Sequence, residues 1–180
     1  VDTPSSEILD KNDFSTAVYI NEPSIVYGSI SRAVENAESG DTVFAQNGLY
    51  TENVSITASN VTLVGEGDPV IDGRIDIESD GVTVEDITVR NGAPSGSGEV
   101  EGIFVGDADG FGNTDEVVRI HNVTVEDVHP HGTEKTLEAI HVKQYEGNVD
   151  GVVVSETTLR NVTQPDAGAN GVKLQAGISD

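Results

Sequence analysis

Hydrophobic and polar residues alternate over very short distances along most of the chain, as the segment Gly81–Gly92 (GVTVEDITVRNG) illustrates. Val82 and Val84 alternate with polar neighbours, Asp86 interrupts the alternation, and the pattern resumes at Ile87. A period of two predicts β-strands, and the interruption predicts a corner between two of them. Strands this short cannot bury a hydrophobic face alone, so they require copies stacked above and below.

Two such strand patterns recur. The first consists of four segments that align without gaps and end in Gly, Asp, Asp and Asn: Val61–Gly65, Val82–Asp86, Val123–Asp127 and Thr157–Asn161. The second consists of Gly102–Val105, Ala139–Val142 and Gly171–Leu174. Gly, Asp and Asn tolerate a left-handed backbone, so the ends of the first pattern predict one column of stacked corners. Irregular spacing between the copies predicts loops of different length between constant strands, which is typical of a parallel β-solenoid.

The N-terminal part differs from the repeats. Apolar residues recur with helical spacing at Ile30, Ala33, Val34 and Ala37, between a potential N-cap at Ser29 and Gly40 beyond the end. We expect an amphipathic helix here, after a strand over Ser15–Ile20, covering the apolar cross-section of the first coil. No equivalent cap is expected at the other end. The interpretation is a single domain over residues 1–180, with a flexible leader (1–13), a strand and capping helix (14–40) and β-helix rungs (41–180).

The chain is strongly acidic, with 32 Asp and Glu residues against 9 Lys and Arg residues and a formal net charge of −23. This charge disfavours nucleic acid and anionic membranes as partners, because both bind clustered basic residues. It indicates a halophilic protein or one saturated with divalent cations, since both conditions neutralise carboxylates. Cys is absent, and no apolar run approaches transmembrane length, so we expect no membrane insertion. A first residue of Val rather than Met favours an extracellular or cell-surface protein.

The segments Gly40–Ala45 (GDTVFA) and Gly48–Val54 (GLYTENV) resemble the start of the pectin-lyase-like superfamily, and more narrowly its carbohydrate-binding and sugar-hydrolysing repeat domains. The resemblance covers about residues 25–175 and implies a right-handed parallel β-helix with three strands per rung. It implies little about activity, because the fold hosts lyases, hydrolases, epimerases, adhesins and inert shafts. Arg119–His121 and His129–His131 only approximate the family's catalytic motifs, with His in place of Lys and of Asp. We therefore lean towards a non-catalytic protein.

An acidic loop is the candidate cation site. Asp107 and Asp109 stand at alternate positions before a Gly, and Asp115 and Glu116 follow. Carboxylate oxygens around a tight turn are the ligands that calcium prefers, so the loop predicts a calcium site. A solvated acidic loop in an acidic protein is the alternative interpretation.

Stacking the second strand pattern places Phe104, His141 and Lys173 in one outward column, with Lys143 in the next. Cationic groups beside an aromatic ring on an acidic chain predict binding of an acidic polysaccharide. A purely structural stack and a seam to another subunit are equally consistent with the pattern. The imidazoles of the four histidines are also potential transition-metal ligands; these residues are His121, His129, His131 and His141.

Four sequons of the form Asn-Val-Ser/Thr begin at Asn53, Asn60, Asn122 and Asn161. Asn161 belongs to the predicted corner column, so its side chain is expected to point inward. The other three are the expected glycosylation sites of an exported protein.

Two functions follow from these observations. The first is a non-catalytic, extracellular structural β-helix that forms homo-oligomers by end-to-end stacking, as a filament or surface-layer subunit does. The second is a polysaccharide-binding or polysaccharide-active module (lyase, hydrolase or epimerase) that uses the Phe104, His141 and Lys173 face. Catalysis there requires a base such as His141 or Lys143, together with a cation near Asp107.

Overall fold

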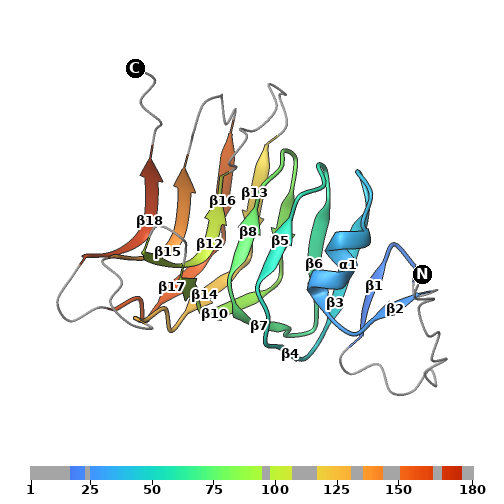
Figure 1. Ribbon diagram of the computed structural model, residues 1–180, viewed down its shortest axis with the longest axis horizontal. Coiled ribbons are helices and arrows are strands. Elements are labelled where there is room, and N and C mark those ends of the chain that lie inside the picture. The colour runs from blue at the N-terminus through green and yellow to red at the C-terminus, as the bar shows by residue number, and fades with distance from the viewer. Residues whose placement is uncertain are drawn as a thin grey trace.

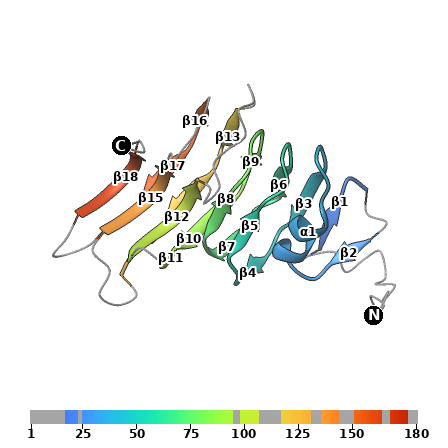
Figure 2. The same ribbon diagram turned by 45° about the horizontal axis from the view of Figure 1, so that its top comes forward.

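The computed structural model describes residues 17–22, 25–94, 98–106, 117–130, 136–143, 151–163 and 168–175. Within these ranges the chain forms three sheets and one short helix. Figure 1 shows the strands side by side along the molecule, from α1 near one end to β18 at the other, and Figure 2 shows the same order from another angle. The protein is therefore all-β, as the alternation predicts.

The strands are distributed over three sheets, named A, B and C. Sheet A contains β1 (Val18–Ile20), β2 (Val26–Tyr27), β3 (Thr42–Gln46), β6 (Thr62–Glu66), β9 (Thr83–Glu85), β13 (Val118–His121) and β16 (Val152–Ser155). Sheet B contains β4 (Leu49–Tyr50), β7 (Val70–Gly73), β10 (Thr88–Asn91), β14 (Thr124–Glu126) and β17 (Thr158–Arg160). Sheet C contains β5 (Val54–Ile56), β8 (Ile75–Ile77), β12 (Glu99–Val105), β15 (Thr136–Lys143) and β18 (Gly168–Gln175), with β11 (Ala93–Pro94) paired to β12.

From β3 onward the described chain visits sheets A, B and C in the same order five times, and β11 is the one addition. Successive strands within each sheet pair in parallel, for example β3 with β6 and β6 with β9. The exceptions are β1, which pairs antiparallel with β2 and β3, and β11, which pairs antiparallel with β12. A recurring order of parallel pairings is compatible with a β-solenoid.

The hydrophobic core consists of columns of stacked aliphatic side chains. In sheet A, Val43 pairs with Leu63, Leu63 with Val84 and Val84 with Ile120, and all of them are fully buried. Burying each such side chain contributes about 1.5–3 kcal/mol. The columns explain how three-residue strands remain stable, because each strand buries its apolar face against the strands above and below.

Helix α1 (Ile30–Asn36) lies against strands of sheets A and C and buries Ile30, Ala33 and Val34. Ser29 is its N-cap and accepts a hydrogen bond from the Arg32 N–H, as the spacing predicts. The helix ends at Asn36 and not near Gly40, because Ala37 already has an extended backbone.

The Glu52 carboxylate completes the start of the helix, since its oxygens accept the N–H groups of Ile30 at 2.8 Å and Ser31 at 3.0 Å. A carboxylate is favourable at a helix N-terminus. The bonds attach α1 to the segment between β4 and β5. The sequence predicted a strand from Ser15, but residues 15 and 16 lie outside the described part, and β1 begins at Val18.

The four aligned repeat segments do not form one column. Val61–Gly65 and Val82–Asp86 belong to sheet A, where β6 pairs with β9. Val123–Asp127 and Thr157–Asn161 belong to sheet B, where β14 pairs with β17. The single-column prediction is wrong because both sheets require the same local pattern, a short alternating strand followed by a residue with positive φ.

The left-handed residues accordingly form two columns of corners. Asp86, Asn122 and Glu156 have φ values of 59°, 49° and 52° between sheets A and B, and Asn91, Asp127 and Asn161 have values of 69°, 55° and 54° after sheet B. Within each column a side-chain amide donates to the carboxylate one coil below, from Asn122 to Asp86 at 2.6 Å and from Asn161 to Asp127 at 2.8 Å. Asn161 is exposed, so the prediction that it points inward is wrong.

Candidate functional site

The outer layer of sheet C brings together the second strand pattern in the predicted register. Phe104 pairs with His141, and His141 with Lys173. The rings of Phe104 and His141 meet edge to face with centroids 5.4 Å apart. Lys143 pairs with Gln175 in the neighbouring column. The register prediction is therefore confirmed, but His141 is fully buried and does not form an open cationic face.

Acidic residues from the preceding positions complete this layer. Glu99 and Glu101 are two residues apart on β12, so they face the same side of the sheet, and Glu101 pairs with Glu138 on β15. Gly102 separates them from Phe104, and a Cβ added there would lie 2.5 Å from Val125 Cγ1 in the core. Both Glu101 and Glu138 are buried, with no more than 1% of each side chain exposed.

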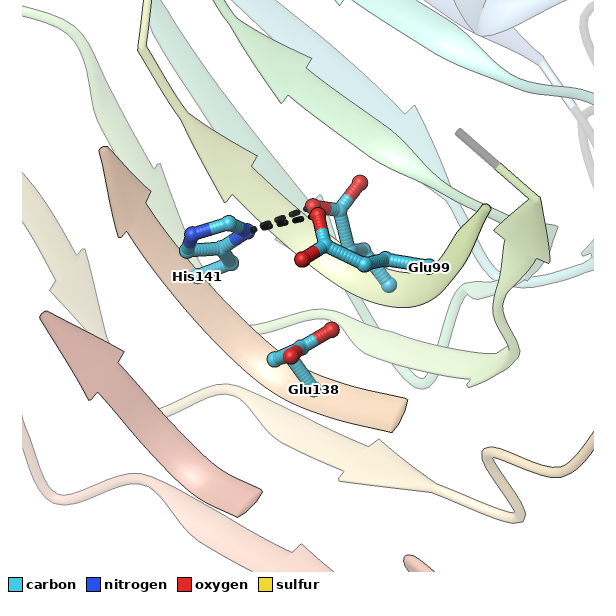
Figure 3. Close-up of side chains that lie close together, drawn as sticks. Glu99, Glu138 and His141 are labelled. Atoms are coloured by element: carbon cyan, nitrogen blue, oxygen red, sulfur yellow. Dashed lines mark hydrogen bonds and ion pairs between the residues drawn. The ribbon is translucent and has the colours of Figure 1, made fainter. Parts of the chain in front are cut away.

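The imidazole of His141 points at the carboxylates of β12 (Figure 3). Its Nδ1 lies 2.6 Å from Glu101 Oε1 and 3.8 Å from Glu99 Oε2. Its Nε2 lies 3.3 Å from Gln175 Oε1. Both ring nitrogens therefore face oxygen atoms, one in a carboxylate and one in an amide.

Two basic side chains are also bonded into the cluster. Arg74 donates to Asp76 at 2.9–3.0 Å and to Glu101 at 2.9 Å. Lys173 donates to Glu99 at 2.8 Å and to Glu138 at 3.1 Å. Both cations bridge two carboxylates, so Lys173, which the sequence assigns to polysaccharide binding, is already paired within the protein.

The pKa values of Asp76 and Lys173 both reflect burial opposed by ionic partners. Burial raises the pKa of Asp76, and the guanidinium of Arg74 offsets that rise only in part. Burial alone would lower the pKa of Lys173, but its hydrogen bonds to Glu99 and Glu138 outweigh burial, so the pKa is raised above its usual value. Lys173 is therefore held firmly in its charged form by two carboxylates.

The cluster has the donor set of a metal site. Glu99, Glu101, Glu138 and His141 each offer one ligand atom, and these atoms all lie within 4.8 Å of one another. Among the described residues, Glu138 Oε2 is the buried side-chain oxygen that lacks a hydrogen-bond partner. Such an atom pays the cost of desolvation without compensation, which points to a missing positive partner.

The sequence reasoning found His141 and Lys173 but missed Arg74 and all of the glutamates. A usable signal was present, because Glu101, Glu138 and Asn170 stand immediately before the three aligned copies of the second pattern. Extending that alignment by one residue would have added a column of two carboxylates and an amide.

Several other predicted site residues fall elsewhere. The predicted calcium ligands, Asp107, Asp109, Asp115 and Glu116, lie outside the described residues, as does His131. The remaining histidines do not converge: His121 is in sheet A, where its Nδ1 lies 3.0 Å from Ser155 Oγ, and His129 is exposed after sheet B. The predicted shared histidine site therefore does not form among the described imidazoles.

The predicted glycosylation residues lie at turns and strand ends. Asn53 and Asn122 are exposed and Asn60 is half-buried. Asn53 Oδ1 accepts the Arg74 N–H at 3.0 Å, and Asn122 Nδ2 donates to Asp86. At Asn53 and Asn122 the side-chain amide therefore already has a structural hydrogen bond.

No protein-family model, curated protein or solved structure matches this chain. The resemblance to the pectin-lyase-like superfamily therefore stays a prediction from the sequence. No described helix has the length and apolar character needed to span a bilayer.

Proposed function

We propose that this chain is a non-catalytic structural protein, a right-handed β-helix of the pectin-lyase-like type that acts outside the cell or on its surface. Its last coil packs end to end against a second copy of the chain. Helix α1 closes the opposite end as a cap. The proposal rests chiefly on one observation, the apolar surface exposed at the β16–β17–β18 end.

Three strand edges coincide with that apolar surface. Among the described strands, β16, β17 and β18 stand at one edge of sheets A, B and C. Val172 and Leu174 on β18 are 46% and 77% exposed, and Val153 and Val154 on β16 are 43% and 37% exposed. Unpaired strand edges and exposed aliphatic side chains are stabilised by docking another strand layer. A second copy of the chain supplies strands with the spacing of these three sheets.

The other end differs in a way that supports the same proposal. There α1 buries Ile30, Ala33 and Val34 at no more than 2% exposure. The β1–β2 hairpin extends sheet A beyond β3. At this end α1 covers part of the apolar surface and leaves Ile25 and Leu49 exposed, at 63% and 55%, whereas no described helix covers β16, β17 and β18.

The alternative function, polysaccharide binding or cleavage on the Phe104, His141 and Lys173 face, receives less support. The ammonium of Lys173 is shared by two carboxylates, and His141 is fully buried. A polymeric sugar has no access to that imidazole in the described structure. Lys143 is half-buried and has its own interactions.

The proposal is tested by the molar mass of the purified protein in solution. Light scattering and sedimentation velocity are run in about 2 M KCl, where charges are screened beyond about 2 Å and the net charge of −23 no longer keeps copies apart. Dimers or longer assemblies are expected. Val172→Lys and Leu174→Lys place charges in the contact and should convert these assemblies to monomers.

Val64→Lys is the matched control. Val64 is half-buried in the middle of sheet A, between Phe44 and Glu85 in register, and far in pairing order from β16. This variant should assemble as the wild type does. Monomeric wild-type protein across the concentration range, or assemblies unaffected by both end variants, would rule the proposal out.

A further inference from the structure

The glutamate–histidine cluster on sheet C contains a buried anionic atom with no partner. Glu138 is fully buried, and Lys173 bonds only its Oε1, at 3.1 Å. Its Oε2 is buried without a hydrogen bond. An uncompensated carboxylate oxygen in a dry site costs several kcal/mol, so buried charges in proteins are generally paired or coordinate metals.

The two ring nitrogens of His141 give a second indication. Nδ1 lies 2.6 Å from Glu101 Oε1 and 3.8 Å from Glu99 Oε2, so this nitrogen faces the carboxylates. Nε2 lies 3.3 Å from Gln175 Oε1 on the opposite side of the ring. A metal-bound imidazole is commonly oriented in this way, by a polar group at its second nitrogen.

The charge balance points the same way. Four carboxylates, those of Asp76, Glu99, Glu101 and Glu138, stand against the cations Arg74 and Lys173, which leaves two negative charges (four minus two). A divalent cation neutralises that excess while Lys173 stays in place, and reduces it to one negative charge when the ammonium turns away.

We propose that Glu99, Glu101, Glu138 and His141 bind a first-row divalent metal ion of the Zn²⁺ or Mn²⁺ class. Carboxylates suit Mn²⁺, Mg²⁺ and Ca²⁺, whereas imidazole suits Zn²⁺ and other transition ions, so the mixed set selects against Ca²⁺. Metal–ligand bonds of about 2.0–2.2 Å place the ligand atoms up to about 4 Å apart. The ligand atoms now lie within 4.8 Å of one another, and Glu101 Oε1 is 2.6 Å from His141 Nδ1, so shifts of about 1 Å bring all of them to that spacing.

The site also has an entrance. Glu99 and Lys173 are 19% and 25% exposed, while Glu101, Glu138 and His141 are buried behind them. Lys173 bridges Glu99 and Glu138 from β18. Its long flexible stem lets the ammonium swing towards solvent when a divalent ion replaces it between the two carboxylates.

Binding is measured on the full chain after chelation and dialysis, in about 1 M KCl so that the acidic surface does not hold ions non-specifically. Titration calorimetry with Zn²⁺ should give one equivalent per chain, and a tenfold excess of Ca²⁺ should not displace it. Zn²⁺ at a hundredfold excess over Kd should raise Tm by about 5–10 °C. Co²⁺ used as a probe should give visible absorption bands.

Two variants test the ligands. Glu138→Gln keeps an oxygen for Lys173 but removes the anionic oxygen, and His141→Gln removes the imidazole. Each should weaken Zn²⁺ binding at least tenfold, and His141→Gln should alter the Co²⁺ bands. Without metal, Glu138→Gln should melt no lower than the wild type, because the substitution removes an unpaired buried charge. Glu85→Gln, a half-buried glutamate on sheet A, is the matched control and should bind Zn²⁺ like the wild type.

This site does not depend on end-to-end assembly, because its ligands lie on β12 and β15, inside sheet C. The proposal is overturned if the wild type binds no stoichiometric Zn²⁺, in which case the contact between His141 and Glu101 is purely structural. It is equally overturned if both ligand variants bind Zn²⁺ as the wild type does, or if Ca²⁺ competes on equal terms.

Discussion

Arg74 holds two buried carboxylates, and its replacement should be among the most damaging single changes on the surface of sheet C. Its side chain is only 17% exposed, and it donates two hydrogen bonds to Asp76 and one to Glu101. Arg74→Met keeps most of the aliphatic stem but removes the charge. Glu101, with 1% of its side chain exposed, then loses its guanidinium partner and keeps His141 Nδ1 as a neighbour at 2.6 Å.

The expected cost follows from that burial. Removing one partner of a buried ion pair typically costs 3–5 kcal/mol, mostly because the other charge remains desolvated. The partial exposure of Arg74 admits water to the gap, so we expect the lower end, about 3 kcal/mol. Neutralising the carboxylates of Asp76 and Glu101 should restore most of the lost free energy of unfolding. The triple variant Arg74→Met, Asp76→Asn, Glu101→Gln should lie within about 1.5 kcal/mol of the wild type, since neutral hydrogen bonds replace charged ones.

The assay is equilibrium urea unfolding followed by circular dichroism, with chelator present so that metal binding does not contribute. Arg90→Met is the matched control, because Arg90 pairs with Asp72 at 3.0 Å but is 36% exposed. Solvent screening limits its expected cost to below about 1 kcal/mol. The reasoning would be refuted if Arg74→Met and Arg90→Met lowered the free energy of unfolding equally. It would also be refuted if the triple variant were as unstable as Arg74→Met.

Three further outcomes are expected. Gly65→Ala places a Cβ 2.0 Å from the backbone oxygen of Asp86 one coil above, so the free energy of unfolding should fall by about 1–3 kcal/mol or more. Gly28→Ala, with no atom within 4 Å of the added Cβ, should be nearly neutral in the same urea assay. Burial raises the pKa of Asp72, but hydrogen bonds from Asn91 and Arg90 outweigh burial and lower the pKa below its usual value. The resulting stabilisation is present above the unfolded value of about 3.9 and is lost as pH falls through the folded value, so Asp72→Asn should destabilise by less than about 1 kcal/mol at pH 7 and by less at acid pH. Because the net charge is −23, raising KCl from 0.1 to 2 M should raise Tm, and an unchanged or lower Tm would contradict charge repulsion as a limit on stability.

The sequence predicted well which segments form strands, but it predicted only part of how those strands stack. Alternation identifies strands because it follows from burial of one face, and the pairing of Phe104 with His141 and Lys173 was correct. The corner alignment failed because Asp86 and Asp127 satisfy the same local rule at two different corners. The local sequence indicates that a corner exists. The number of residues between corners decides which column of corners that residue joins.

The charged cluster was harder to predict for a different reason. Glu99, Glu101 and Glu138 are ordinary outward positions of a strand in a chain with 32 acidic residues, so composition indicates solvated carboxylates. Their burial depends on contacts across coils, such as Arg74 reaching from one coil to Glu101 in the next. Twenty-seven positions separate those two residues, and no local pattern encodes that distance.

The two surfaces of sheet C explain how one fold accommodates both features. Ile75, Ile103 and Ile140 stack in register on the inner side and are fully buried, so the apolar columns hold the coils together whatever the outer side carries. The outer side can therefore collect ionisable groups, at a cost of a few kcal/mol that the core tolerates. A uniform stack of like charges would repel between coils about 4.8 Å apart. Here the column changes chemistry at each step, from Asp76 to Phe104, His141 and Lys173, so no carboxylate in it faces another. Where two carboxylates do stack, at Glu101 and Glu138, Arg74 and Lys173 donate to them.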